Sequence, residues 1–342
     1  MHKRTQPVKQ SFKIFGINSA GIKSKLKSFE NVMKTIQPMV WMMQETKLKP
    51  NEKISCASLN NFQVFYLNRQ TSQGGGIALG VNKDYDSTLI KEGNDETEAI
   101  AVKIFLKEME VRTVCAYGPQ ETASKDKKDK FWEFLEEEVI SAELEEDGLI
   151  IQMDGNLHAG SSVVKNDPNK QNNNGRLFCE FLERHSELIV VNALDICEGL
   201  ITRKRVLSSR TEEAVLDFYI INEKMMPFLK KMEVDETKKY NLLNLAQCKK
   251  NSRITETDHN GLLLDMDLNV EKKKPERVEV FDFKNKACQE AFLEETDKNQ
   301  ELVDCFEGDE QPLVSQAAKW KKSFDNILHK CFRKIRITKR KD

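Results

Sequence analysis

Short apolar runs recur through the first 268 residues, and several of them stop at a polar residue. β-branched and aromatic residues are frequent in these runs, which is typical of strands buried in a sheet. Between some of them lie segments with a helical spacing of apolar residues, at residues 27–36, 129–140 and 175–185. Strands that alternate with helices in this way predict one α/β domain, with large sheets covered by helices.

The run LIIQM at residues 149–153 is followed directly by Asp154, Gly155 and Asn156. Ends of neighbouring strands in an α/β sheet cluster in space, and such clusters are where these folds bind ligands. We therefore expect the polar side chains at comparable places to meet. These residues are Asn18, Glu45, Tyr117, Asp154, Asn156, Asp217, Asp258 and His259.

Together these residues have the chemistry of a phosphate site with a hard cation. Carboxylates and amide oxygens suit Mg²⁺, which prefers oxygen ligands. Neutral amides and a histidine can face phosphate oxygens without repelling them. Taken singly, each residue has an ordinary interpretation, because an aspartate after a strand is usually a turn or a helix cap. Only their joint order along the chain indicates a site.

Six blocks occur in the order found in the endonuclease/exonuclease/phosphatase superfamily, which the sequence resembles over about residues 12–268. Three stretches look most similar to the endonuclease domain of non-LTR (LINE-type) retrotransposon polyproteins, and to stand-alone proteins derived from them: residues 116–120, residues 172–193 and the tail FRKIRITKRK. The six blocks are GINSAG (16–21), MMQETKL (42–48), CAYGPQ (115–120), IQMDGN (151–156), LDFYIIN (216–222) and TDHNGL (257–262).

The resemblance implies a fold and a metal site. The fold would be a four-layer α/β sandwich, in which two mixed β-sheets are flanked by helices. A C-terminal helical extension would follow the sandwich. Glu45 and Asn18 would hold Mg²⁺, for which Mn²⁺ can substitute, and Asp258 would lie at or near a second metal position.

The resemblance also implies catalytic roles in Mg²⁺-dependent hydrolysis of phosphodiester bonds in DNA, with nicking of one strand as in retrotransposon target-site cleavage. Asp154 would align or deprotonate the attacking water. Asn156, Tyr117 and His259 would contact the scissile phosphate. Asp217 would hydrogen-bond His259 and favour its charged imidazolium form.

The sequence departs from the family pattern at three positions. Many members carry a polar residue two places after the first asparagine, where this chain has Ala20. The middle residue of the Asp-x-Asn block is often aromatic but is Gly155 here, which would loosen the turn. Thr257 replaces the usual serine before Asp-His. No essential functional group is lost, so we expect an active enzyme.

The charge of the chain is nearly balanced, with a net charge of −1, but it is unevenly distributed. Residues 319–342 contain ten lysines and arginines and only two acidic residues. A second basic segment covers residues 202–210. Both segments could contact the phosphates of DNA, the expected partner. The candidate DNA-contacting residues in the second segment are Arg203, Lys204, Arg205 and Arg210.

The organisation predicted from these features has three parts: a flexible N-terminus at residues 1–11, an endonuclease-like domain at 12–270, and a charged linker with a basic helical extension at 271–342. No apolar run approaches the roughly 20 residues of a membrane helix, and residues 1–10 lack the apolar core of a secretory signal. We expect an intracellular, nuclear protein.

The chain lacks the Tyr/Phe-x-Asp-Asp signature of a polymerase. It would therefore be either a fragment that precedes a reverse transcriptase region in a parent polyprotein or a stand-alone derivative.

Two other functions remain open from the sequence. One is an abasic-site repair nuclease or a phosphatase of the same superfamily, because specificity in this fold depends on surface loops. The other is a nucleic-acid-binding scaffold without catalytic activity. Loss of Glu45 or His259 would favour the scaffold, and both residues are present.

Overall fold

The computed structural model divides the chain into two compact units, residues 1–272 and residues 273–342. The expected flexible N-terminus, residues 1–11, lies outside the described residues. The structure describes residues 12–70, 74–107, 109–244, 256–268, 277–281, 286–299, 313–332 and 334–338.

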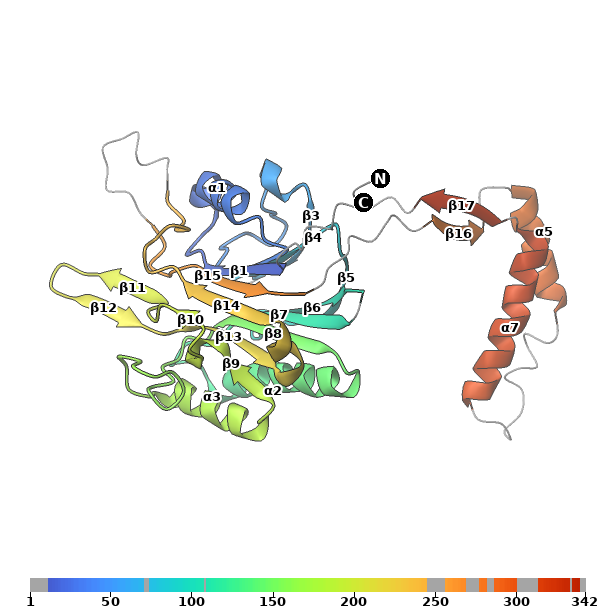
Figure 1. The fold of residues 1–342 in the computed structure, drawn as a ribbon. Coiled ribbons are helices and arrows are strands. Elements are labelled where there is room, and N and C mark those ends of the chain that lie inside the picture. Colours follow the sequence, from blue (N-terminus) through green and yellow to red (C-terminus); the bar gives the residue numbers. More distant parts are fainter. Residues whose placement is uncertain are drawn as a thin grey trace, which may run out of the picture. The chain divides into compact units, whose positions relative to one another are not determined.

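The first unit contains two large mixed β-sheets (Figure 1). The strands of the seven-stranded sheet are, in order across it, β10 (Cys197–Glu198), β14 (Leu229–Val234), β15 (Leu262–Met266), β1 (Phe12–Asn18), β2 (Val40–Gln44), β4 (Ile77–Asn82) and β3 (Phe62–Leu67). Those of the six-stranded sheet are β5 (Asp86–Glu92), β6 (Glu98–Phe105), β7 (Glu110–Tyr117), β8 (Gly148–Asp154), β13 (Asp217–Asn222) and β9 (Leu188–Val190).

Helices cover the outer faces of both sheets (Figure 1). Helix α1 (Leu26–Ile36) packs on the seven-stranded sheet, where Phe29 contacts Trp41 of β2. Helices α2 (Lys125–Leu144) and α3 (Asn173–Arg184) pack on the six-stranded sheet, and Phe178 of α3 contacts Phe218 of β13. A third apolar cluster fills the space between the sheets. The four-layer α/β sandwich predicted from the sequence is therefore confirmed.

The directions of the strands bring the predicted site residues to one edge of the sandwich. β1 and β2 are parallel, so Asn18 and Glu45 stand at their adjacent ends. β7 and β8 are also parallel, and Tyr117 is paired in register with Asp154. The antiparallel strand β13 begins at Asp217, directly opposite Asp154. Parallel strands contribute their last residues to this edge, and antiparallel strands contribute their first.

Several strands lie where the sequence shows no long apolar run. These are β5, β14 and a two-stranded hairpin formed by β11 (Arg203–Val206) and β12 (Thr211–Ala214). Their sequences are rich in charged residues, because the strands lie at or near the edge of a sheet or outside the two large sheets. The basic segment at residues 202–210 is therefore part of a β-hairpin.

The second unit contains α5 (Lys286–Lys298) and α7 (Leu313–Cys331), as expected of a helical extension. It also contains β16 (Arg277–Phe281) paired antiparallel with β17 (Lys334–Thr338). Both strands lie within residues 271–342, which were expected to hold only a charged linker and a helical extension, so that expectation was incomplete. Valines and isoleucines alternate with charged residues in both stretches, which is the period of a strand.

None of the described helices is both long enough and apolar enough to cross a membrane.

The close packing of Trp41 of β2 against Gly80 of β4 can be tested by substitution. Gly80 of β4 is the register partner of Trp41, and a Cβ atom at Gly80 would lie 2.2 Å from Nε1 of the buried indole. Gly80→Ala should lower the free energy of unfolding by about 1–3 kcal/mol, as overpacking does in cores. Urea denaturation measures this loss.

The double variant Gly80→Ala/Trp41→Phe is the control for this contact. The smaller ring leaves room for the new methyl group, so the double variant should lose less stability than the sum of the two single changes. Strictly additive losses would show that the two positions do not interact.

Candidate active site

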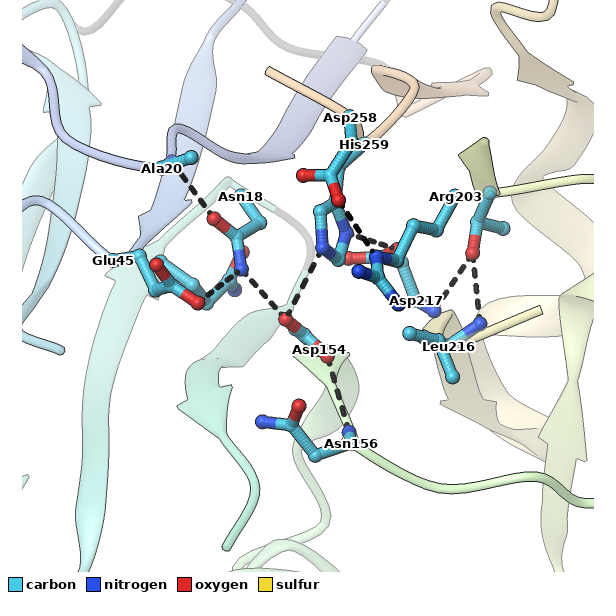
Figure 2. Close-up of polar contacts among 12 residues, drawn as sticks. Asn18, Ala20, Glu45, Asp154, Asn156, Arg203, Leu216, Asp217, Asp258 and His259 are labelled. Carbon is cyan, nitrogen blue, oxygen red and sulfur yellow. Dashed lines mark hydrogen bonds and ion pairs between the residues drawn. The ribbon is translucent and has the colours of Figure 1, made fainter. Parts of the chain in front are cut away.

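Asn18 lies at the centre of the site and links the two sheets (Figure 2). Its Nδ2 donates to Oδ2 of Asp154 at 2.7 Å and to Oε1 of Glu45 at 3.3 Å. The hydroxyl of Tyr117 donates to the same Glu45 oxygen at 2.8 Å. The side-chain oxygen Oδ1 of Asn18 accepts from the backbone N–H of Ala20 at 2.9 Å. This amide orientation is the one that satisfies both carboxylates, which can only accept.

Glu45 is ionised and already has a cation beside it. Its Oε2 lies 2.8 Å from Nζ of Lys47, and its side chain is 22% exposed. Burial alone would raise the pKa of Glu45, but hydrogen bonds from Lys47 and Tyr117 outweigh burial, and the pKa is lowered. Glu45 therefore offers a charged oxygen at the surface of the site.

The turn after β8 is tightly held. The backbone N–H of Gly155 donates to Leu216 at 2.8 Å, and that of Gly118 donates to Asp154 at 2.7 Å. Asn156 donates its backbone N–H to Oδ1 of Asp154 at 3.1 Å and its Nδ2 to the Gly118 carbonyl at 2.9 Å. A Cβ atom at Gly118 would lie 2.3 Å from the carbonyl oxygen of Gly155. Gly155 therefore does not loosen the turn as expected, because the two chain segments approach closely and bond to each other.

His259 and Asp217 form the predicted pair. Nδ1 of His259 lies 2.8 Å from Oδ2 of Asp217, and both side chains are buried. Burial alone would lower the pKa of His259, but the charges of Asp217 and then of Asp154 outweigh it and raise the pKa to about 9. The imidazolium form is therefore favoured at neutral pH.

Asp154 is the carboxyl group most affected by its surroundings. Burial raises its pKa, and the negative charge of Asp217 raises it further. Its Oδ2 lies 3.9 Å from Nε2 of His259, which is too long for a hydrogen bond. The Nε2 proton of the imidazolium is therefore free to donate to a bound group.

Asp258 faces Arg203 in this structure. Nε of Arg203 donates to Oδ2 of Asp258 at 2.9 Å (Figure 2). Burial alone would raise the pKa of Asp258, but the charges of His259 and Arg203 outweigh it and lower the pKa. Of the other candidate DNA-contacting residues, Lys204 and Arg210 form ion pairs within the hairpin, with Glu213 and Glu212 respectively.

Three residues that support the site are not marked as such in the sequence. The Thr202 hydroxyl accepts the backbone N–H groups of Leu216 at 2.8 Å and Asp217 at 3.0 Å, which fixes the start of β13. Thr257, expected to be a mild replacement for serine, donates to the backbone carbonyl of Asn18 at 2.7 Å. Lys25 donates to three successive backbone carbonyls after Asn18, beginning with that of Ser19 at 2.7 Å. No local pattern distinguishes these side chains from ordinary turn residues.

Backbone strain is concentrated at the site. Ala20, Glu45, Lys47 and Asn156 have positive φ angles of 46°, 48°, 51° and 47°. Such conformations cost of order 1–3 kcal/mol each and persist where the surroundings determine them. The hydrogen bonds around Asn18 and Asp154 provide that constraint.

The donor set fits a hard divalent cation. The Glu45 carboxylate and the side-chain oxygen of Asn18, which accepts from the backbone N–H of Ala20, are oxygen donors, and the ammonium of Lys47 already pairs with Glu45. Asp154, Asp217 and His259 form a second group, whose ligand atoms lie within 4.8 Å of one another. The buried Oδ1 of Asp217 has no hydrogen-bond donor among the residues that the structure describes.

Comparison with known proteins shows similarity in fold. No protein-family model matches the chain, and no curated protein matches its sequence. One similar solved structure is the endonuclease domain of TRAS1, a telomere-specific non-LTR retrotransposon, at 16% identity and a TM-score of 0.55, covering 75% of this chain and 99% of that one. Another is the 3′ phosphatase NExo from Neisseria bound to a product DNA hairpin, at 17% identity and a TM-score of 0.55, covering 75% and 100%.

A third is an endonuclease/exonuclease/phosphatase family protein from Leptotrichia buccalis, at 14% identity and a TM-score of 0.50, covering 75% of this chain and 99% of that one. The chain therefore has the fold of the endonuclease/exonuclease/phosphatase superfamily, as its sequence motifs indicate. These three similar structures are an endonuclease domain, a phosphatase and a protein that carries the family name.

The His259–Asp217 pair predicts a pH dependence of stability. The folded pKa of about 9 exceeds the ordinary value of 6.5, so protonation of His259 stabilises the fold. That contribution is fully present below pH 6.5 and is lost as the pH rises through about 9. An NMR titration of the histidine ring protons in metal-free protein measures the pKa directly.

Asp217→Asn removes the charge and leaves burial as the main influence, so the pKa of His259 should fall. The spectrum of His259→Gln, which lacks this imidazole ring, shows which NMR signal belongs to His259. A pKa near the ordinary value of 6.5 in the unaltered protein, or no change in Asp217→Asn, would contradict the pairing.

Proposed function

We propose that this protein is a divalent-metal-dependent endonuclease that hydrolyses phosphodiester bonds in DNA and nicks one strand. The observation that carries the proposal is the convergence of Asn18, Glu45, Asp154 and the Asp217–His259 pair at one edge of the sandwich. This arrangement combines a group that can accept a proton, a charged donor and a cation-binding carboxylate. These are the groups that phosphodiester hydrolysis requires.

Asp154 is the group that positions and deprotonates the attacking water in this proposal. Its raised pKa supports the role, because a base works best when its pKa lies near the operating pH. The Asn18 amide holds Oδ2 of Asp154, and the turn holds Oδ1, so the carboxylate has a fixed orientation. His259 donates its free Nε2 proton to a phosphate oxygen, where negative charge builds up in the transition state.

Tyr117 and Asn156 complete the phosphate-facing set. Burial, together with the charge of Glu45, raises the pKa of Tyr117, so its hydroxyl stays protonated; it would donate to a phosphate by releasing its hydrogen bond to Glu45. The side chain of Asn156 is fixed by the Gly118 carbonyl. Both groups are neutral and therefore do not repel a phosphate.

Glu45 is the residue we assign to the metal, with the side-chain oxygen of Asn18. Mg²⁺ is the cation proposed, and Mn²⁺ can substitute, because both accept oxygen ligands. When bound, the cation would stabilise negative charge on the phosphate and on the leaving oxygen. Lys47 would give up its ion pair with Glu45 in exchange.

DNA is the proposed substrate, and the similarity in fold to the TRAS1 endonuclease domain supports a retrotransposon-type nicking activity. Such an activity would require a nuclear location and could work beside a reverse transcriptase region. A phosphatase or an abasic-site nuclease would use the same groups, and the similarity to NExo favours keeping the phosphatase as the second candidate.

Nicking of supercoiled plasmid in Mg²⁺ against chelator tests the proposal, with His259→Ala as the inactive control. A phosphomonoester at a DNA 3′ end and a duplex with one abasic position test the alternatives. Release of phosphate or cleavage at the abasic position, without plasmid nicking, would favour them.

Glu45→Gln should abolish most of the metal-dependent activity. The change keeps the shape of the side chain and removes the charge that holds the cation, so nicking should fall by orders of magnitude while the fold survives. Plasmid nicking over a range of Mg²⁺ concentrations measures this.

Glu30→Gln is a matched control for Glu45→Gln, since Glu30 pairs with Lys27 and Lys34 on the surface of α1. It should nick normally. Near-normal activity of Glu45→Gln at low Mg²⁺ would refute the assignment of the metal to Glu45.

Asp217 and His259 should act as one unit in the reaction. Asp217→Asn and His259→Ala should each slow single-turnover nicking by about 10²- to 10⁴-fold, the range for a positioned proton-transfer group. The double variant should be little slower than either single variant. Multiplicative losses, in proteins whose circular dichroism is unchanged, would mean that the two residues work separately.

A further inference from the structure

The β11–β12 hairpin begins inside the site. The backbone N–H of Lys204 donates to the carbonyl of Asp258 at 2.8 Å, and that of Asn260 donates to the carbonyl of Thr202 at 2.6 Å. Arg203 and His259 are thereby paired as an isolated antiparallel bridge. The first residue of β11 is therefore fixed by its main chain against the segment that carries the catalytic histidine.

The side chain of Arg203 is held in the same place. Its Nε uses one of the five N–H groups of the guanidinium to bind Oδ2 of Asp258 at 2.9 Å. Nη1 and Nη2 have no hydrogen-bond partner among the residues that the structure describes, and the side chain is 27% exposed. Two nitrogens of a fixed, charged group therefore remain available to a ligand.

The other basic residues of the hairpin differ from Arg203. Lys204 and Arg210 are paired with glutamates of β12, and both are exposed. Arg205 is also exposed and lies further along β11. The side chains of Lys204 and Arg210 thus pair within the hairpin, and that of Arg205 faces solvent. The side chain of Arg203 instead binds Asp258, the residue that precedes His259.

We propose that Arg203 is a phosphate-binding residue of the reaction, and that Asp258 is the positioning residue that aims its guanidinium. The two terminal nitrogens would donate to non-bridging oxygens of the phosphate held at His259. A guanidinium binds two phosphate oxygens in a fork geometry that lysine cannot reproduce. This inference rests on the proposed endonuclease function and assigns one further residue to it.

The proposal changes the role expected of Asp258. Its carboxylate has its cation from the chain itself, as Arg203 neutralises it at 2.9 Å. A second metal at Asp258 would have to displace this contact. The two assignments therefore make opposite predictions for variants of Asp258 and Arg203.

The experiment compares Arg203→Gln, Arg203→Lys, Asp258→Asn and the double variant Arg203→Gln/Asp258→Asn in the full chain. Arg184→Gln is the matched control, because it removes the same charge from an exposed arginine of α3 that pairs with Glu136 outside the site. Two quantities are measured on one duplex DNA: the single-turnover nicking rate at saturating DNA across Mg²⁺ concentrations, and the affinity in chelator by fluorescence anisotropy.

Arg203→Gln should nick about 10- to 100-fold more slowly than the unaltered protein, as expected for loss of a hydrogen bond to a charged group. Arg203→Lys should recover part of the rate. Arg184→Gln should keep its rate within about twofold, and Arg203→Gln should bind DNA more weakly than it in chelator. Asp258→Asn should resemble Arg203→Gln, with an unchanged Mg²⁺ requirement, and the double variant should be no slower than either.

Equal rates for Arg203→Gln and Arg184→Gln would overturn the proposal, since Arg203 would then make no contribution to the reaction. A raised Mg²⁺ requirement in Asp258→Asn, together with a lowered one in Arg203→Gln, would overturn it in favour of a metal at Asp258. If the unaltered protein does not nick DNA, the proposed function fails, and the role of Arg203 falls with it.

Discussion

The amide of Asn18 is the contact on which the site depends. It belongs to β1 of one sheet, and it donates both to Glu45 of the same sheet and to Asp154 of the other. Because carboxylates only accept hydrogen bonds, no other orientation of the amide satisfies both. The amide of Asn18 therefore fixes the separation of Glu45, the carboxylate proposed to bind the metal, from Asp154, the proposed base. A second hydrogen bond also joins the sheets, because the hydroxyl of Tyr117, at the end of β7 in the six-stranded sheet, donates to Glu45.

The sandwich tolerates several carboxylates in a small volume because each has a donor or a cation. Lys47 forms an ion pair with Glu45, Arg203 with Asp258, and His259 with Asp217. Buried charges without such partners would cost several kcal/mol each. Asp154 has neutral donors, Asn18 and Asn156, but its ion pair with His259 is long, at 3.9 Å, and its pKa is raised. Asp154, the group proposed to accept a proton, is thus the carboxylate of the site whose charge is least neutralised by a neighbouring cation.

Strained backbone and tight turns support this arrangement. Glu45 and Asn156 both have positive φ angles, and both follow a buried strand directly or closely. Such geometry is maintained only by rigid neighbours, and the parallel pairs β1–β2 and β7–β8 provide them. Gly118 illustrates the principle, because its lack of a side chain permits close contact with the carbonyl of Gly155, and this contact holds the turn.

The sequence by itself determined an α/β domain with polar residues at the ends of its strands, because burial imposes apolar runs that stop where the strands end. The order of the six motifs, through the resemblance that they carry, then implied the four-layer sandwich. The resemblance to the superfamily implied the pairing of His259 with Asp217, and the burial of Asp217 indicated only that it needs some partner.

Only the tertiary structure decided what the remaining residues touch. Arg203 was expected to contact DNA with its neighbours in the basic segment, but the structure places it against Asp258. The strands β16 and β17 were hidden in charged sequence, and Thr202 carries no local signal. These outcomes depend on contacts between residues about 15 to 60 positions apart. Such contacts follow from strand register and direction, which local composition does not encode.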